Sequence, residues 1–506
     1  MKSLPPVPRR PAKIYFTDFF DVTPEVLTKY GAFNISPYVD LPLFIDPFLL
    51  FTSDKLEYQG LHAEIIRYLG FLRDKSENGT INDGLLKAWY CFHEVHQNCF
   101  GFCESGNRGV GLGLGFAAAL SQNLAELFKD FGKEHVTRGS HLEKLMLIRS
   151  GVGKDKISDF TTNLIKGFLV RYTEAFAKKH VPSTKRRRVS VSHVEFDYVR
   201  GAWKSDFFDL PWLNGDYILL TPEDILTKDD TWINKEDLRN DFPQIRESIE
   251  NDALRAQVNH YFESALKRDK DKRGRDKDPT VKQEREAVEA TLRKFPELID
   301  YYIREKEDNG DIAVERSKRK VDEVELRFVQ NISFLAQQLA SYTAFYETPE
   351  TTLDEARRRV EYLKHVIEDL DGYRLFYDAK GAQIEREKDL QIAFKLVCID
   401  TPSSIDAEVN NGRGPVDFKV SRGSADKTLI EFKLASNSQL ERNLRNQVEI
   451  YEKANRTPQS LKVVLFFTAA EEIKIKQALR NLKVPADAGV VLIDARRDNK
   501  PSASKA

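Results

Sequence analysis

Cysteine, methionine and long apolar runs are scarce in this chain. It has four cysteines and two methionines in 506 residues, which argues against a disulfide framework and favours a reducing cytoplasm. No run of about 18 apolar residues offers a membrane span, and the basic start lacks the apolar stretch of a secretory signal. The net charge of -1 excludes a globally basic nucleic-acid binder. Any nucleic-acid contact must therefore come from local patches.

The length predicts more than one domain, because a single hydrophobic core rarely extends over 506 residues. Aromatic and glycine-rich sequence with helical periodicity fills residues 1–235, to which the sequence assigns no reaction. Residues 236–350 are highly charged and favour helices, and residues 351–500 alternate helices with strands. The prediction is a multidomain α+β protein with mainly helical N-terminal and middle regions and a C-terminal α/β domain.

Two basic segments lie outside the C-terminal region. Lys185, Arg186, Arg187 and Arg188 are consecutive, and they are either a solvated loop or a phosphate-contact patch. Residues 267–278 contain seven basic and four acidic residues and no apolar side chain. Such a segment cannot bury anything, so a mobile loop is expected, with a DNA-contacting loop as the alternative.

The C-terminal region shows an alternating order of elements. Apolar periodicity predicts a helix over 384–397 followed by three strands, and then helix, strand, helix and strand. The strands are expected at 405–409, 415–421, 427–434, 461–468 and 488–494, and the later helices at 438–454 and 470–482.

Three residues on two of these strands form a candidate catalytic site. Asp417 lies on one strand, and Glu431 and Lys433 lie on the next, where side chains two residues apart share a face. Charged residues among Leu429, Ile430, Phe432 and Leu434 are costly to bury unless they have a use. Two carboxylates on adjacent strands can hold Mg²⁺, and the lysine can neutralise developing charge or orient a water molecule.

With Val416-Asp417 and Glu431-Phe432-Lys433, the sequence resembles the PD-(D/E)XK nuclease superfamily. Pro415 stands two places before the aspartate, rather than immediately before it. Gln447 and Tyr451, four apart on the following helix, resemble the Q-x-x-x-Y motif of RecB-like branches. The acidic residue of the first helix is matched best by Glu387, with Glu385 and Asp389 as competitors.

The resemblance implies a restriction-endonuclease-like core and a cytoplasmic endodeoxyribonuclease that depends on Mg²⁺ or Mn²⁺ and acts in restriction or antiphage defence. DNA is the expected partner; a homo-oligomer and partner proteins of a defence system are left open. Glu408 is a further candidate metal ligand. Candidate nucleic-acid contacts are Arg413, Arg442, Arg445, Lys185, Arg186 and Arg187. The alternatives are a catalytically inactive binding or regulatory protein on the same fold and a nuclease gated by a nucleotide bound in the N-terminal half.

Two N-terminal segments resemble ligand sites only weakly. The glycine-rich run 105–115 precedes a predicted helix, but it matches neither a Walker A nor a Rossmann pattern and is interpreted as a structural loop. Cys91, His93, His96, Cys99 and Cys103 include ligand types for zinc. Their spacing lacks the paired arrangement of common zinc sites, so no zinc site is predicted.

Overall fold

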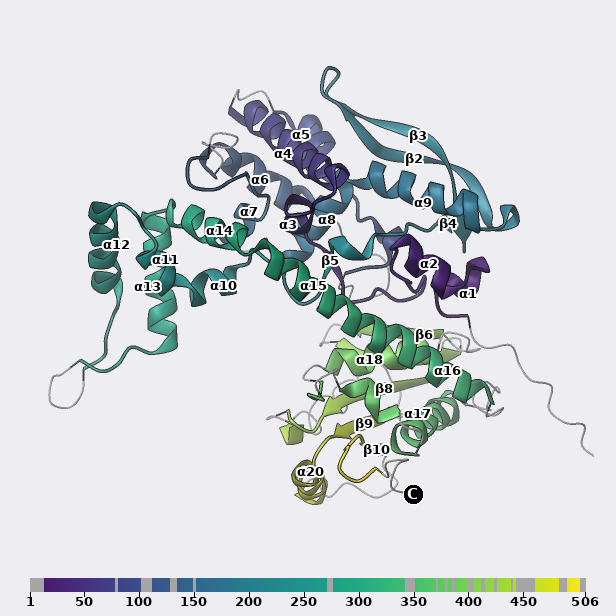
Figure 1. Cartoon of the computed structure of the whole chain (residues 1–506). Helices are drawn as coiled ribbons and strands as arrows, with labels where there is room; N and C mark the ends of the chain where they lie inside the picture. The colour runs from purple at the N-terminus through teal and green to yellow at the C-terminus, as the bar shows by residue number, and fades with distance from the viewer. Residues whose placement is uncertain are drawn as a thin grey trace, which may run out of the picture.

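The computed structural model shows an N-terminal part, a helical arm and a C-terminal sheet (Figure 1). The structure describes residues 13–77, 81–101, 112–127, 134–148, 152–270, 276–341, 351–369, 372–377, 381–384, 387–398, 404–410, 415–422, 426–437, 440–442, 460–481 and 489–500.

The N-terminal part is helical, with a twisted β-hairpin on one side. Its core is rich in aromatic residues, among them the fully buried Phe16, Phe33 and Phe160. The hairpin joins β2 to β3 in antiparallel register and packs on α9. The elements are α1 Phe16–Phe20, α2 Pro24–Tyr30, β1 Phe44–Ile45, α3 Pro47–Phe51, α4 Leu56–Glu77, α5 Asp83–Tyr90, α6 Leu114–Leu127, α7 Lys144–Ile148, α8 Lys154–Leu164, α9 Lys166–His180, β2 Arg186–Asp197, β3 Ala202–Leu213, β4 Asp216–Tyr217 and β5 Leu226–Thr227.

A helical arm extends away from the N-terminal part (Figure 1). Its apolar core includes Phe242, Val258 and Tyr302 and continues into the N-terminal part through Phe48 and Leu147. At its base the Glu307 carboxylate accepts hydrogen bonds from the backbone N–H groups of Arg138 and Gly139, which fastens the arm to the N-terminal part. The arm consists of α10 Lys235–Asn240, α11 Phe242–Glu247, α12 Asp252–Ala265, α13 Val281–Lys294 and α14 Leu298–Asp308.

One long helical segment then leads from the N-terminal part to the C-terminal sheet (Figure 1). It comprises α15 (Gly310–Glu325), a π-helical turn (Leu326–Gln330) and α16 (Asn331–Ser341). Val324, Phe328 and Ile332 are buried along it, in a hydrophobic core shared with both the N-terminal part and the sheet. The two halves of the chain are therefore packed together through this helix.

The C-terminal unit is a five-stranded mixed sheet whose strands lie side by side in chain order, β6 to β10. β7 is antiparallel to β6 and β8, whereas β8, β9 and β10 are parallel. The elements are α17 Thr352–Asp369, α18 Glu387–Val397, β6 Ser404–Asn410, β7 Pro415–Arg422, β8 Asp426–Leu434, β9 Ser460–Phe466, α20 Ala469–Asn481 and β10 Val490–Asp494.

Helices cover both faces of this sheet, as the alternation of side chains along β9 shows. Val463 belongs to the core on the side of α17 and α18, whereas Val464 packs with Ile475 of α20. The predicted order of helices and strands is confirmed wherever these elements are described, and so is the α+β class. Most of the helix expected over 438–454 lies outside the described residues. None of the described helices has the length and apolar composition needed to cross a bilayer.

Candidate active site on the C-terminal sheet

The candidate site lies where the pairing between β7 and β8 stops. The strands are paired from Arg422–Asp426 to Phe418–Ile430, and Asp417 is the next residue along β7. Beyond that point the backbone N–H of Phe432 donates to Asp417 Oδ2 at 2.6 Å. The aspartate side chain thus satisfies a backbone donor of the neighbouring strand, which fixes the carboxylate at the end of the ladder.

Lys433 brings the predicted acidic residues together. Its Nζ atom lies 3.2 Å from Glu431 Oε1, as expected for side chains two apart on β8. The same atom is 3.9 Å from Asp417 Oδ2 and 3.3 Å from Glu387 Oε2. Side chains from β7, β8 and α18 therefore meet around one ammonium group.

The structure places two of the three acidic candidates of the first helix, Glu387 and Asp389. Glu387 opens α18, and its Oε1 accepts hydrogen bonds from the Leu434 backbone N–H at 3.2 Å and from Asn437 Nδ2 at 3.3 Å. Asp389 instead pairs with Arg327 Nη1 at 2.8 Å. Glu385 lies outside the described residues. Glu387 is thus the described helix carboxylate that reaches the site.

One residue of this site was missed by the sequence reasoning. Gln391 Nε2 donates to Asp417 Oδ1 at 2.7 Å. Gln391 lies four residues after Glu387, so both project from the same face of α18. That i,i+4 spacing was the available signal, but a glutamine on a helix has no distinguishing chemistry until its partner is known.

Burial and the close approach of several carboxylates shift the pKa values of the site residues. Burial raises the pKa of Asp417 to about 7, although Lys433 and the Phe432 N–H act in the opposite direction. Burial also raises the pKa of Glu431 against the pull of Lys433. Burial acts to lower the pKa of Lys433, but the surrounding carboxylates outweigh it and the pKa is raised. Three carboxylates share one ammonium, so the site favours a further positive charge.

The donor set suits a hard divalent cation, although the carboxylates surround Lys433. Glu387, Asp417 and Glu431 supply the oxygen ligands that Mg²⁺ prefers. Within the described ranges, no three His, Cys, Asp or Glu side chains are grouped closely enough to ligate one ion.

Several predicted site residues are not placed. Glu408 belongs to β6, but its side chain is not among those described. Arg442 is exposed. Gln447, Tyr451, Arg413 and Arg445 lie outside the described residues.

Three residues of the basic segment 185–188 belong to a strand, because β2 begins at Arg186, whereas Lys185 ends a 3₁₀ turn; of the two alternatives, the solvated loop was wrong for the arginines. Lys185 Nζ pairs with Asp21 at 2.7 Å and donates to the Phe19 carbonyl oxygen at 2.6 Å. Arg186 pairs with Asp209 across the hairpin. Arg187 and Arg188 are exposed, and the Arg187 guanidinium lies 4.8 Å from the centre of the Trp212 ring. Lys185 and Arg186 thus have structural partners, and the two exposed arginines are better placed for phosphate contact.

The two N-terminal segments add no site that the structure describes. His96 Nε2 lies 3.0 Å from Asp216 Oδ2, and Cys99 is buried. Cys103 and most of the glycine-rich run lie outside the described residues.

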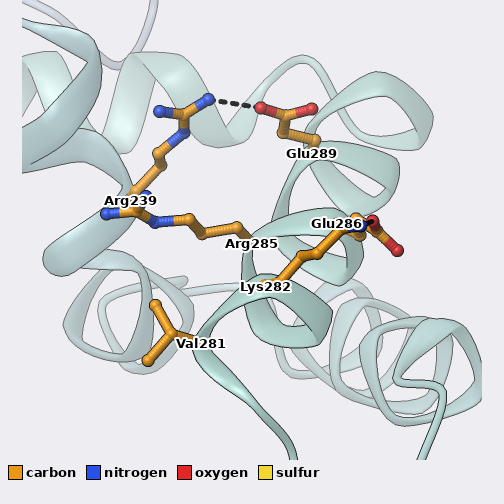
Figure 2. A pocket seen from close by; sticks show the side chains of 6 residues that line it. All are labelled: Arg239, Val281, Lys282, Arg285, Glu286 and Glu289. Atoms are coloured by element: carbon orange, nitrogen blue, oxygen red, sulfur yellow. Dashed lines mark hydrogen bonds and ion pairs between the residues drawn. The ribbon is translucent and has the colours of Figure 1, made fainter. Parts of the chain in front are cut away.

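A separate pocket of about 410 Å³ opens between α10 and α13 of the arm (Figure 2). Arg239 reaches across it to form an ion pair with Glu289, and Arg285 pairs with Glu236 at 2.9 Å. These pairs stabilise the packing of the two helices. The lining residues are Arg239, Val281, Lys282, Arg285, Glu286 and Glu289.

Comparison with protein families gives two matches. Residues 21–234 match the family described as Domain of unknown function (DUF8370), and residues 352–469 match the one described as Domain of unknown function (DUF8371). The second match spans the whole candidate site, from Glu387 to Lys433. No curated protein and no solved structure matches the chain. The chain is thus similar to two families whose descriptions state no activity.

Proposed function

We propose that the C-terminal unit is a metal-dependent nuclease that hydrolyses phosphodiester bonds in DNA. The observation that carries this proposal is the meeting of Asp417, Glu431 and Glu387 within 3.9 Å of Lys433 Nζ. These groups come from two strands and a helix, and gathering them in a buried place is costly unless they act on a charged ligand.

The architecture supports the same proposal. A mixed sheet between helices, with the acidic residues at the point where β7 parts from β8, suits the restriction-endonuclease-like core implied by the resemblance to the PD-(D/E)XK superfamily. The helix before the sheet supplies Glu387, as that resemblance leads one to expect.

Each residue has a chemical role in this proposal. Asp417, Glu431 and Glu387 hold the metal, and a bound Mg²⁺ or Mn²⁺ would polarise a phosphoryl oxygen and activate a water molecule. Lys433 stabilises the negative charge that develops on the phosphate or orients the attacking water. The Phe432 N–H and Gln391 hold the Asp417 carboxylate in its orientation.

DNA as the substrate and a role in restriction or antiphage defence rest on the resemblance. The exposed Arg187 and Arg188 and the exposed Arg442 are available for phosphate contacts. Cytoplasmic location belongs to the same proposal.

One observation favours a second candidate, a nucleic-acid-binding protein without turnover. The Lys433 ammonium already neutralises part of the charge of the three carboxylates around it. Salt-sensitive DNA binding without metal-dependent cleavage would support this candidate.

The test is cleavage of supercoiled plasmid by the full chain with Mg²⁺ or Mn²⁺, compared with EDTA. Single-stranded DNA and RNA serve as alternative substrates. Asp417→Asn and Lys433→Met should each lower the rate by about 100-fold or more, as expected when a group that stabilises the transition state is lost. Lys427→Met is the matched control, because Lys427 lies on β8 opposite Ser421, six residues before Lys433. Unchanged cutting by both folded site variants would refute the assignment.

A further inference from the structure

The long helical segment that joins the two halves of the chain is anchored to the N-terminal part at several points. On α15, Lys320 Nζ donates to the Lys228 carbonyl oxygen at 2.9 Å, and Ser317 Oγ donates to Thr227 Oγ1 at 3.3 Å. At the π-helical turn, the buried Tyr15 hydroxyl donates to the Phe328 carbonyl oxygen. A π-helical turn shifts the hydrogen-bond register of a helix and often marks a functional position. Here it lies where the helix passes from the N-terminal part to the sheet (Figure 1).

The same turn holds α18 through one buried ion pair. Arg327 Nη1 donates to Asp389 Oδ2 at 2.8 Å, and the two residues are 8% and 9% exposed. Removing one partner of a buried pair leaves the other charge uncompensated, so the geometry of such a pair is firmly held. The position of α18 is thereby tied to the turn.

The opposite side of α18 carries two contacts of the candidate site. Glu387 and Gln391 are one helical turn apart, and they bond to Lys433 and to Asp417 respectively. Asp389 lies two residues from each of them, about 200° around the helix axis. A short rigid helix thus has the site on one side and the Arg327 pair on the other. A shift of α18 by 1 Å would displace both site contacts together, and misplacement of about that size is costly in catalysis.

We propose that Arg327 is a positioning residue that couples the N-terminal half of the chain to the candidate active site. By holding Asp389 it sets the placement of α18, and through α18 it sets the orientation of the Glu387 and Asp417 carboxylates. This inference rests on the proposed function and adds to it a route by which the N-terminal half controls the nuclease. A ligand or partner that moves the long helix would change metal affinity and cleavage without touching the site.

The experiment compares three forms of the pair in the full chain. The double variant Arg327→Met with Asp389→Leu removes the link without leaving a buried charge, which keeps the fold intact where a single replacement would strain it. The exchange of Arg327→Asp with Asp389→Arg restores an ion pair of opposite polarity. Arg316→Met is the matched control, since Arg316 is on α15 and lies 3.9 Å from Asp237 of the arm.

Two quantities are measured on each form: Mn²⁺ affinity by calorimetric titration and the rate of plasmid cleavage. The double variant should lose about 10- to 100-fold in both, the loss typical when groups that orient metal ligands are removed. Its urea midpoint should stay near the wild-type value. The exchanged pair should recover most of the loss, and Arg316→Met should behave as wild type.

The possible failures can be told apart. A folded double variant with wild-type Mn²⁺ affinity and cleavage would overturn the role of Arg327 and leave the proposed function standing. An equal loss in Arg316→Met would also overturn it, because the effect would then belong to the helix as a whole. A wild-type chain that neither binds Mn²⁺ nor cleaves would overturn the proposed function and this inference with it.

Discussion

His62 offers a sharp test of the electrostatics of the N-terminal part. It lies on α4 with 6% of its surface exposed, and its Nε2 atom has no hydrogen-bond partner among the described residues. Its ring packs 5.2 Å from the ring of Phe51 and 5.8 Å from that of His141. Burial lowers the pKa of His62 to about 3, and the neighbouring His141 acts in the same direction. The folded protein therefore holds this imidazole neutral.

The effect on stability follows from proton linkage. An unfolded chain binds a proton at His62 with a pKa of about 6.5, whereas the folded chain does so only near 3. The unfolded state thus gains protons first as the pH falls below 6.5, and stability is lost from there down to about 3. Each pH unit below 6.5 in this window lowers the free energy of unfolding by about 1.4 kcal/mol, so about 2 kcal/mol is lost at pH 5.

The assay is urea unfolding at pH 7.5 and pH 5.0, followed by tryptophan fluorescence. The four tryptophans all precede residue 235, so the signal reports this part of the chain. His62→Gln removes the titrating group, and the wild type should lose about 2 kcal/mol more than this variant between the two pH values. His135→Gln makes the same change at an exposed position and should follow the wild type. Equal pH dependence of wild type and His62→Gln would refute the reasoning.

Three further predictions concern the C-terminal unit and the hairpin. Asp417 has a pKa of about 7, so Mn²⁺ binding should displace its proton, and the affinity for Mn²⁺ should rise from pH 6 to pH 8. Calorimetry in buffers of different ionisation enthalpy would detect the released protons. An affinity that does not change with pH would contradict this prediction. Arg359→Met should cost about 2–3 kcal/mol in urea unfolding, because it removes the buried charged hydrogen bonds to Glu355 Oε1 while Arg422 still pairs with Oε2. An unchanged free energy of unfolding would contradict this. Gly167→Ala should lower the thermal midpoint, since a Cβ there would overlap the Val194 carbonyl oxygen at a cost of about 1–3 kcal/mol; an unchanged midpoint would show that α9 and β2 can separate freely.

Local pattern predicted much of the C-terminal unit. The strands around Asp417 and Lys433 were predicted to within two residues of their observed ends, because apolar periodicity and turn residues act over a few neighbouring positions. Strand geometry alone predicted that Glu431 and Lys433 point to the same face of the sheet. Their role as candidate site residues could be predicted because burying charged residues in an otherwise apolar strand is costly unless they are paired or bind a ligand.

Side-chain contacts between segments far apart in the sequence could not be predicted from local pattern. Glu387 rather than Asp389 reaches the candidate site because of the side of α18 that faces the sheet. Asp389 instead forms an ion pair with Arg327, which is 62 residues away in the sequence. The Gln391 contact with Asp417 and the strand that begins at Arg186 are decided in the same manner, by packing partners. Local sequence therefore determined the elements and the acidic residues of this protein, whereas only the tertiary structure decided which side chains meet, because a contact depends on how distant segments pack.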